Sequence, residues 1–252
     1  MTDTVVYSQD GHVGTLLLNN PARHNALGRE QLDAIMRVLD HVATDDAVRA
    51  LMVTGAGEKT FCAGASLAEL SAGEMGDDAF QRMTASLAAL RIPTICALNG
   101  NVFGGGVELA VSCDFRIGIE GMRMRVPAAA LGLCYPPDGI ERFVQCLGVS
   151  VTRRVLMAAE EFQAQEMLQI GFLDHLVLAD ELQGRAQEYA AAVAALAPLA
   201  VQNMKQVLRQ AASGGIDPES ARELADACLQ SEDLQEGFAA QRDKRPPSFR
   251  RR

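Results

Sequence analysis

The first two thirds of the chain alternate short apolar runs with segments whose apolar residues recur at helical spacing. The runs have the length of a buried strand and cover residues 13–18, 50–54, 94–98 and 114–119. Between them, helical spacing predicts helices over residues 32–42, 77–90 and 104–112. Strands that are apolar on both faces are typical of parallel sheets covered by layers of helices. The alternation therefore predicts an α/β fold.

After about Gly139 the pattern becomes mostly helical. Helical spacing predicts helices over residues 140–147, 151–158, 164–170, 181–196, 199–212 and 218–229. One short strand is expected at residues 175–178, and no internal repeat or flexible linker is evident. We therefore expect two regions, a core over residues 1–195 and a C-terminal helical region over residues 196–252.

The end of the sequence is strongly basic. Residues 241–252 carry five arginines and Lys244 against a single acid, Asp243. One interpretation is a solvated and partly disordered end. The other is a contact with an anionic ligand or with a neighbouring subunit, and the sequence leaves both open.

Net charge and apolar patterning exclude several classes of protein. The chain has 252 residues and a formal net charge of −9, whereas binding to nucleic-acid phosphates requires a basic face. No apolar run reaches the ~20 residues that a membrane span needs, and the start of the sequence lacks the pattern of a secretory signal. We therefore expect a cytoplasmic protein that binds neither nucleic acid nor membranes.

The cysteines and histidines do not form a recognisable site. The six cysteines are scattered without a CxxC pair, and most lie among apolar neighbours. This usage is typical of buried, reduced thiols rather than disulfides. The four histidines lie far from one another and from any paired cysteines, so no metal site is expected.

Two glycine-containing turns follow neighbouring predicted strands. Residues 61–65 come after the second strand, and residues 99–106 come after the third. Small residues allow the backbone to approach a ligand closely, and a turn that leads into a helix leaves free N–H groups. Two such turns can direct two N–H donors at one oxygen, which is an oxyanion hole suited to an enolate or tetrahedral anion formed from a thioester. The alternative is that these glycines only permit tight packing of a helix on a strand.

Four blocks of sequence resemble a known family. They read NPARHNAL at residues 20–27, FCAGASL at 61–67, NGNVFGGGVELA at 99–110 and CDFR at 113–116. In this order and at this spacing the blocks resemble the crotonase (enoyl-CoA hydratase/isomerase) superfamily. Residues 238–249 also resemble the C-terminal end of that family, so the resemblance covers nearly the whole chain.

The resemblance implies a fold, an assembly and a substrate class. It implies a crotonase-like spiral of ββα turns with a C-terminal helical trimerisation region, assembled as a homotrimer or a dimer of trimers. The implied substrate is an acyl-CoA thioester. No metal or redox cofactor is implied, because coenzyme A is part of the substrate and holding the enolate is the catalytic device.

The resemblance also implies roles for individual residues. The backbone N–H groups of Ala65 and Gly105 would form the oxyanion hole. The residues implied in binding substrate or CoA are Arg23, Ala26, Ala63, Ser66, Leu67, Gly104 and Tyr135. Arg23 is a candidate for contact with the CoA phosphate or adenine, although a surface arginine needs no such role.

Glu108 is the first catalytic candidate. It matches the first of the two glutamates that hydratases of the family commonly use, one to activate water and one to protonate the α-carbon. A carboxylate in the first turn of a helix is also stabilising without any catalysis. The second glutamate is missing, because the matching position is Ala128, which can neither give nor take a proton.

Asp138 and Tyr135 are candidates to replace the missing group. Asp138 follows two prolines, and some family members place an acidic residue in this loop. The same residues are consistent with a turn and a helix start in which Asp138 is the N-cap. Tyr135 is another candidate proton donor.

The sequence leaves the exact reaction open. An enoyl-CoA hydratase-like enzyme is the first interpretation, and an enoyl-CoA isomerase is the alternative, since one carboxylate can carry a proton between two carbons. Decarboxylation or thioester hydrolysis would also need only a stabilised anion. A catalytically silent CoA-binding protein is a further alternative, which the loss at Ala128 favours and the presence of Glu108 opposes.

Overall fold

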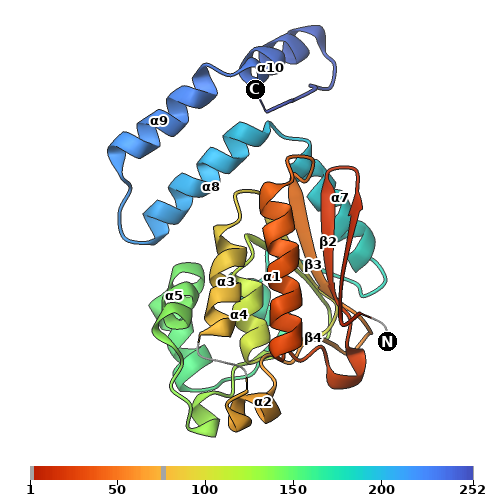
Figure 1. Cartoon of the computed structure of the whole chain (residues 1–252), viewed down its shortest axis with the longest axis vertical. Coiled ribbons are helices and arrows are strands. Elements are labelled where there is room, and N and C mark those ends of the chain that lie inside the picture. Colours follow the sequence, from red (N-terminus) through yellow and green to blue (C-terminus); the bar gives the residue numbers. More distant parts are fainter. Residues whose placement is uncertain (1–2, 75–77, 252) are drawn as a thin grey trace.

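A computed structural model describes residues 3–74 and 78–251, and its main feature is a six-stranded sheet (Figure 1). In spatial order the strands are β1 (Val5–Asp10), β2 (Val13–Leu18), β3 (Ala50–Gly55), β5 (Thr94–Leu98), β7 (Phe115–Ile119) and β10 (His175–Val177). β1 and β2 are antiparallel, and every later pair is parallel. All residues of β3 and β5 are buried, as their continuous apolar runs predict.

A second, smaller sheet is built from short strands. Its order is β4 (Thr60–Cys62), β6 (Asn101–Phe103), β8 (Arg123–Arg125) and β9 (Phe162–Gln163). Strands β4, β6 and β8 each follow a strand of the main sheet, so the chain winds through repeated pairs of strands with helices between them. The α/β fold and the spiral of ββα turns are therefore confirmed.

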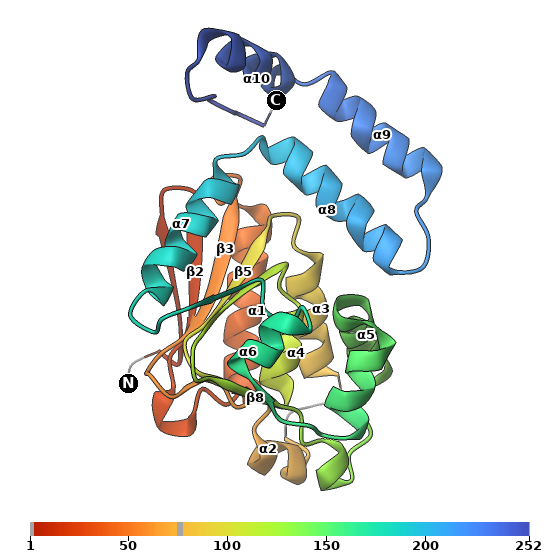
Figure 2. The same ribbon diagram turned by 180° about the vertical axis from the view of Figure 1, so that it is seen from behind.

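Helices cover both faces of the main sheet (Figures 1 and 2). The helices of this part are α1 (Arg29–Thr44), α2 (Leu67–Ala72), α3 (Ala79–Ala89), α4 (Gly105–Val111), α5 (Pro137–Thr152), α6 (Ala164–Gln169) and α7 (Leu182–Ala194). Helix α1 packs on β1 and β2, and α7 packs against β2, β3, β5 and β7. Asp77, the predicted start of the helix over residues 77–90, lies outside the described residues.

Two predicted helices near residues 140–158 differ from the structure. Helix α5 extends to Thr152 across Gly148, whose φ of 71° and ψ of 163° are not helical, and a π-helical turn over Arg153–Met157 follows. The predicted interruption between residues 147 and 151 is therefore a kink at a glycine, which adopts positive φ without the steric cost of a side chain.

The last three helices extend away from the main sheet (Figures 1 and 2). They are α8 (Pro198–Ala212), α9 (Pro218–Leu229) and α10 (Glu232–Asp243). Helix α8 is tied to the core by Lys205, whose Nζ donates to Asp114 Oδ2 at 2.6 Å and to the Ile92 carbonyl at 2.8 Å. Large apolar side chains nevertheless stay exposed on these helices, among them Met204, Leu208, Leu229 and Phe238.

The basic tail folds back onto acids of the same chain. Arg245 forms an ion pair with Glu236 at 2.6 Å, and Asp233 accepts the backbone N–H groups of Arg250 and Arg251 at 2.7 and 2.9 Å. Most of the predicted basic tail is thus held within its own chain, an arrangement that neither sequence interpretation included. Arg252 lies outside the described residues.

The six cysteines are all free, and Cys62, Cys96 and Cys113 are buried. This confirms the expected unpaired thiols. Burial raises the pKa of the Cys62 thiol to about 12, so this side chain behaves as a small apolar residue. In the part of the chain that the structure covers, no helix combines the length and the apolar character needed to cross a membrane.

Candidate active site

The two glycine turns meet at the start of α4. Gly64 has a φ of 86°, and a β-carbon at this residue would lie 2.5 Å from the Gly105 nitrogen. Gly104, the N-cap of α4, has a φ of 53° and a ψ of −126°, a combination that residues with a side chain rarely adopt. The turns can therefore approach each other this closely only because both positions are glycine.

This approach brings the backbone of Ala65 and Gly105 together. A β-carbon at Gly105 would lie 3.3 Å from the Ala65 nitrogen. Gly105 is the first residue of α4, and the first N–H groups of a helix have no acceptor within it. Leu27 bonds to the Gly64 carbonyl and to the Ser66 N–H, so the Ala65 N–H is directed away from that bridge. The two N–H groups predicted as an oxyanion hole thus lie in neighbouring turns, and in the described part of the chain neither donates to a backbone carbonyl of a turn or loop.

Glu108 lies on the first turn of the same helix, with only 1% of its surface exposed. Its Oε1 accepts a hydrogen bond from Thr84 Oγ1 at 3.1 Å, contributed by α3. The same oxygen accepts from Arg142 Nη1 at 3.0 Å, contributed by α5. Helix α4 therefore places a single buried carboxylate between two neighbouring helices.

The surroundings of Glu108 shift its pKa. Burial is the largest influence and raises the pKa of the Glu108 carboxyl, because the charged form loses its hydration. The interactions with Tyr135, Arg142 and Thr84 act in the opposite direction without cancelling this effect. A carboxyl with a raised pKa exchanges protons nearer to neutral pH than an exposed one, which suits a group that must both take and give a proton.

Helix α5 approaches Glu108 closely because residue 139 is glycine. A β-carbon at Gly139 would lie 2.7 Å from the Tyr135 ring and 3.3 Å from the carboxyl carbon of Glu108. Tyr135 also packs edge-to-face on Phe143, with ring centroids 5.6 Å apart. Burial, followed by the charge of Glu108, raises the pKa of Tyr135 well above its usual range. Tyr135 therefore stays a neutral hydroxyl beside the carboxylate.

Asp138 is nearby but is exposed. Its charge is the smallest of the named influences on Glu108, and it raises the pKa of that carboxyl. The predicted N-cap role is wrong, because the helix begins earlier. Pro136 is the N-cap and Pro137 the first helical residue, which leaves Asp138 inside the first turn. Ala128 is 7% exposed and brings no ionisable group to this region.

Two partners of Glu108 were not predicted from the sequence. Thr84 and Arg142 lie 24 and 34 residues from Glu108 along the chain, on α3 and α5. Neither belongs to a motif, and helical spacing alone does not tell which side chains of two different helices meet a third. Only the placement of the helices reveals these contacts.

Three of the residues implied in CoA binding share one cavity. A hollow of about 310 Å³ is lined by Arg23, Ala26 and Ser66, together with neighbouring polar residues. Ser66 is also the N-cap of α2, where its Oγ accepts the Glu69 N–H at 3.4 Å. Leu67, the first residue of α2, is 61% exposed. The structure thus brings Arg23, Ala26 and Ser66 together, with Leu67 next to them.

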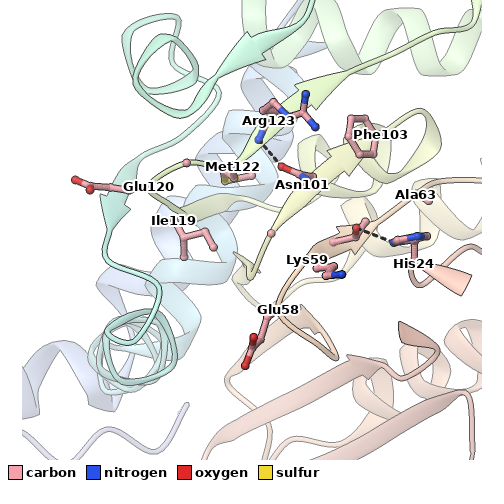
Figure 3. A pocket seen from close by; sticks show the side chains of 13 residues that line it. His24, Glu58, Lys59, Ala63, Asn101, Phe103, Ile119, Glu120, Met122 and Arg123 are labelled. Atoms are coloured by element: carbon pink, nitrogen blue, oxygen red, sulfur yellow. Dashed lines mark hydrogen bonds between the residues drawn. The ribbon is translucent and has the colours of Figure 1, made fainter. Parts of the chain in front are cut away.

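Ala63 lines a different cavity, of about 520 Å³ (Figure 3). This cavity also contains His24, whose Nδ1 lies 3.1 Å from Thr60 Oγ1, and Asn101, whose Oδ1 accepts the Arg123 N–H at 2.8 Å. The Ala63 N–H donates to the His24 carbonyl at 2.9 Å. Arg23 lines the first hollow and His24 the second, so consecutive residues contribute to both. None of the other residues implied in CoA binding lines this second cavity.

Comparison with known proteins identifies the family. Residues 8–252 match the enoyl-CoA hydratase/isomerase family. The chain belongs to this family. The short-chain-enoyl-CoA hydratase of Clostridium acetobutylicum is 32% identical over 254 residues, which is 96% of either chain. The 2,3-dehydroadipyl-CoA hydratase of Escherichia coli is 32% identical over 255 residues, 98% of this chain and 99% of the relative.

A solved structure agrees with this membership. The enoyl-CoA hydratase of Bacillus anthracis superposes with a TM-score of 0.89 at 25% identity, covering 99% of this chain and 100% of the other. This protein is thus an enoyl-CoA hydratase-like enzyme of the crotonase type, as the four sequence blocks predict. The roles of the individual site residues remain predictions of the family resemblance.

Proposed function

We propose that this enzyme adds water across the double bond of an enoyl-CoA thioester, with Glu108 as its proton carrier. The observation that carries the proposal is the placement of Glu108. It is a buried carboxylate with a raised pKa, on the helix whose first residue, Gly105, lies beside Ala65 of the other glycine turn. Three of the curated relatives that the chain matches are named as hydratases of enoyl thioesters.

The proposed reaction needs one carboxylate and two N–H donors. The Glu108 carboxylate takes a proton from water while the water oxygen bonds to the β-carbon of the substrate. The electrons of the double bond move to the thioester oxygen, where the N–H groups of Ala65 and Gly105 stabilise the enolate. Glu108 then returns the proton to the α-carbon, and the thioester carbonyl re-forms. All atoms of one water molecule enter the product, and Glu108 ends as it began.

These steps fit a site in which alanine, Ala128, stands at the position of the second carboxylate. Because the proton taken from water is the one returned, no separate acid is required. Tyr135 lies beside Glu108 as a neutral hydroxyl and is the alternative donor to the α-carbon. Asp138 is a more remote candidate, since it is exposed. No electron enters or leaves, so the proposal includes no redox cofactor, and it requires no metal.

The cavity at Arg23, Ala26 and Ser66 is the proposed place for part of the CoA moiety. Arg23 and Arg29 line it together with the carboxylates of Glu30 and Glu69, and a guanidinium can bind a phosphate. Leu67 offers an exposed apolar surface next to it. Ala63 and Gly104 would line the path from this cavity to the oxyanion hole, because they lie in the same two glycine turns.

Residues 196–252 are proposed as the part that assembles the enzyme into a trimer or a dimer of trimers, and residues 1–195 as its catalytic core. The support is the exposed apolar surface of α8, α9 and α10, where Leu208 is 68% and Leu229 is 64% exposed. Apolar surface of this kind is usually covered by a partner. Analytical ultracentrifugation measures the mass of the assembly directly. We also propose a cytoplasmic location, which the six free cysteines support.

Isomerisation of an enoyl-CoA is the second candidate, favoured by the same single carboxylate. An isomerase takes a proton from one carbon and returns it to another, which Glu108 can do alone. Its product has the mass of the substrate, whereas hydration adds one water.

Turnover of crotonyl-CoA tests the proposal. Purified enzyme is mixed with crotonyl-CoA, the absorbance of the conjugated thioester is followed, and the product mass is read alongside. Loss of absorbance with a gain of one water supports hydration. Retained absorbance, with CoA thioester still binding, contradicts hydration of this substrate. A 3-enoyl-CoA is then supplied, and a gain of absorbance at constant mass would assign isomerisation instead. No turnover of either thioester would favour a silent CoA-binding protein.

A further inference from the structure

We infer that Arg142 is a positioning residue that keeps Glu108 in the orientation and charge state from which it can accept a proton. The inference rests on the proposed function, because it concerns how one carboxylate serves in place of two. It begins from the geometry of the Glu108 carboxylate and the side chains that face it.

The carboxylate is held from two sides by hydrogen bonds to one oxygen. Thr84 Oγ1 and Arg142 Nη1 both reach Oε1, at 3.1 and 3.0 Å. Two donors from different helices on the same oxygen fix the plane of the carboxylate, and the Tyr135 side chain is a further hydrogen-bond partner of it. Thr84 provides a neutral dipole, whereas Arg142 provides a full positive charge in a bridge whose side chains are 13% and 1% exposed.

The charged and titratable groups around Glu108 come from each element packed on it. Arg142 and Asp138 lie on α5, Tyr135 lies just before α5, and the Thr84 hydroxyl comes from α3. Burial and the charge of Asp138 favour the neutral acid, which cannot accept a proton from water. The positive charge of the Arg142 guanidinium favours the carboxylate.

This balance matters because the second carboxylate is absent. In a site with two carboxyl groups, one can begin each cycle as the base and the other as the acid. Here Ala128 leaves Glu108 to do both, so each turnover must begin with Glu108 charged. Nη1 of Arg142 also lies 3.5 Å from the Asp138 carbonyl, so the guanidinium is held between α4 and the start of α5. The placement of Arg142 therefore gives a lone carboxylate its required starting state.

The test compares Arg142→Gln, which keeps a hydrogen-bond donor but removes the charge, with Arg142→Lys, which keeps the charge. We expect Arg142→Gln to lose about tenfold or more in kcat/KM near pH 7 and to recover as the pH rises, because its Glu108 ionises later. Near pH 7, Arg142→Lys should retain part of the activity that Arg142→Gln loses, because it keeps the positive charge. Arg185→Gln is the matched control, since Arg185 is an exposed arginine that pairs with Glu188 on α7.

A readout that does not depend on turnover accompanies the kinetics. The carboxyl of Glu108 is titrated by NMR in protein labelled with ¹³C at the glutamate carboxyls, and the signal is assigned by its loss in Glu108→Gln. The signal should titrate at higher pH in Arg142→Gln than in the wild type, and the control should match the wild type.

The outcomes separate the inference from the proposed function. An unchanged Glu108 titration in Arg142→Gln, or a loss of activity that is equal at every pH, overturns the role of Arg142. If the Glu108 titration shifts in Arg142→Gln but the wild-type enzyme converts no enoyl thioester, the electrostatic role of Arg142 stands and the proposed reaction is rejected. Circular dichroism of both variants excludes a general loss of folding as the cause.

Discussion

Glu108 and Lys205 are both buried ionisable residues with an oppositely charged partner, but they lie in different parts of the molecule. Glu108 pairs with Arg142 at 3.0 Å inside the core, and Lys205 on α8 pairs with Asp114 at 2.6 Å. Burial raises the pKa of Glu108 and lowers the pKa of Lys205, because in both cases it favours the neutral form. The same desolvation therefore acts on both residues.

The two ion pairs differ in the structural elements that their other hydrogen bonds connect. Asp114 is engaged further by the Thr94 N–H and hydroxyl, at 2.7 and 2.9 Å, and Lys205 also reaches the Ile92 carbonyl. This network joins a helix to the ends of two strands. Glu108 accepts from Thr84 and Arg142 on one oxygen and has Tyr135 as a further hydrogen-bond partner. It lies beside the two glycine turns. A network that joins a helix to two strands holds architecture, whereas a buried carboxylate beside the glycine turns of the proposed oxyanion hole is placed to do chemistry.

The largest effect is expected from Glu108→Gln. Glutamine keeps the shape and the hydrogen-bonding capacity but cannot carry the proton, so kcat for an enoyl-CoA should fall by roughly two orders of magnitude or more. Steady-state kinetics with crotonyl-CoA measure the change. The control is Glu58→Gln, which should retain the wild-type rate. Glu58 is an exposed glutamate that lines the cavity in Figure 3. A Glu108→Gln enzyme of near-normal rate would remove Glu108 from the mechanism.

Lys205→Met is expected to act on stability instead of on chemistry. Methionine fills similar space, but Asp114 and the Ile92 carbonyl lose their buried donor, which costs about 1–3 kcal/mol in the free energy of unfolding. Urea denaturation followed by circular dichroism measures this loss. Lys59→Met provides the control, because Lys59 is exposed. If kcat per folded protein fell as far as in Glu108→Gln, the distinction between the two pairs would be wrong.

The sequence predicts the interior of the fold better than its edges. Strands β3 and β5 are buried along their whole length, so their apolar runs identify them. Strand β1 was not predicted, because it lies at the edge of the sheet and most of its residues are exposed. Helix α10 was also not predicted, since its sequence is mostly polar and only Asp233 and Ala240 are buried.

The candidate site could also be predicted only in part from the sequence. The glycine turns at Ala65 and Gly105 could be predicted because close backbone approach requires small residues at fixed places. Arg142 could not, because its contact with Glu108 depends on how two helices far apart in sequence pack together. The N-cap role of Asp138 was wrong because the helix begins one residue before Asp138, at Pro137, with Pro136 as the N-cap.

Gly139→Ala would test how closely α5 must approach Glu108. The added β-carbon would lie 2.7 Å from the Tyr135 ring, so the ring or the helix must move, at a cost of about 1–3 kcal/mol in stability. The shift should also lower kcat/KM, because Arg142 and Tyr135 are carried by the same segment. Gly184→Ala on α7 is the matched control: nothing lies within 4 Å of its added carbon, and alanine stabilises a helix by roughly 0.5–1 kcal/mol relative to glycine. Equal stability of the two variants would show that the contact at Gly139 is loose.

The smallest expected effect is a displacement of the pH profile of the wild-type enzyme. Catalysis in either proposed reaction begins from the charged form of Glu108, so kcat/KM falls when that carboxyl takes up a proton. Because burial raises the pKa of Glu108, this acid limb should lie above the usual glutamate range, and activity should rise with pH through it. Lys205 cannot produce this limb, since loss of its proton breaks the ion pair with Asp114 and would lower rather than raise activity as the pH increases. Rates of crotonyl-CoA conversion between about pH 4 and 9 locate the limb, and the same limb in Lys205→Met would assign it to the catalytic pair. A limb within the ordinary glutamate range would mean that Arg142 and Thr84 outweigh burial, and the site would then be better hydrated than its geometry indicates.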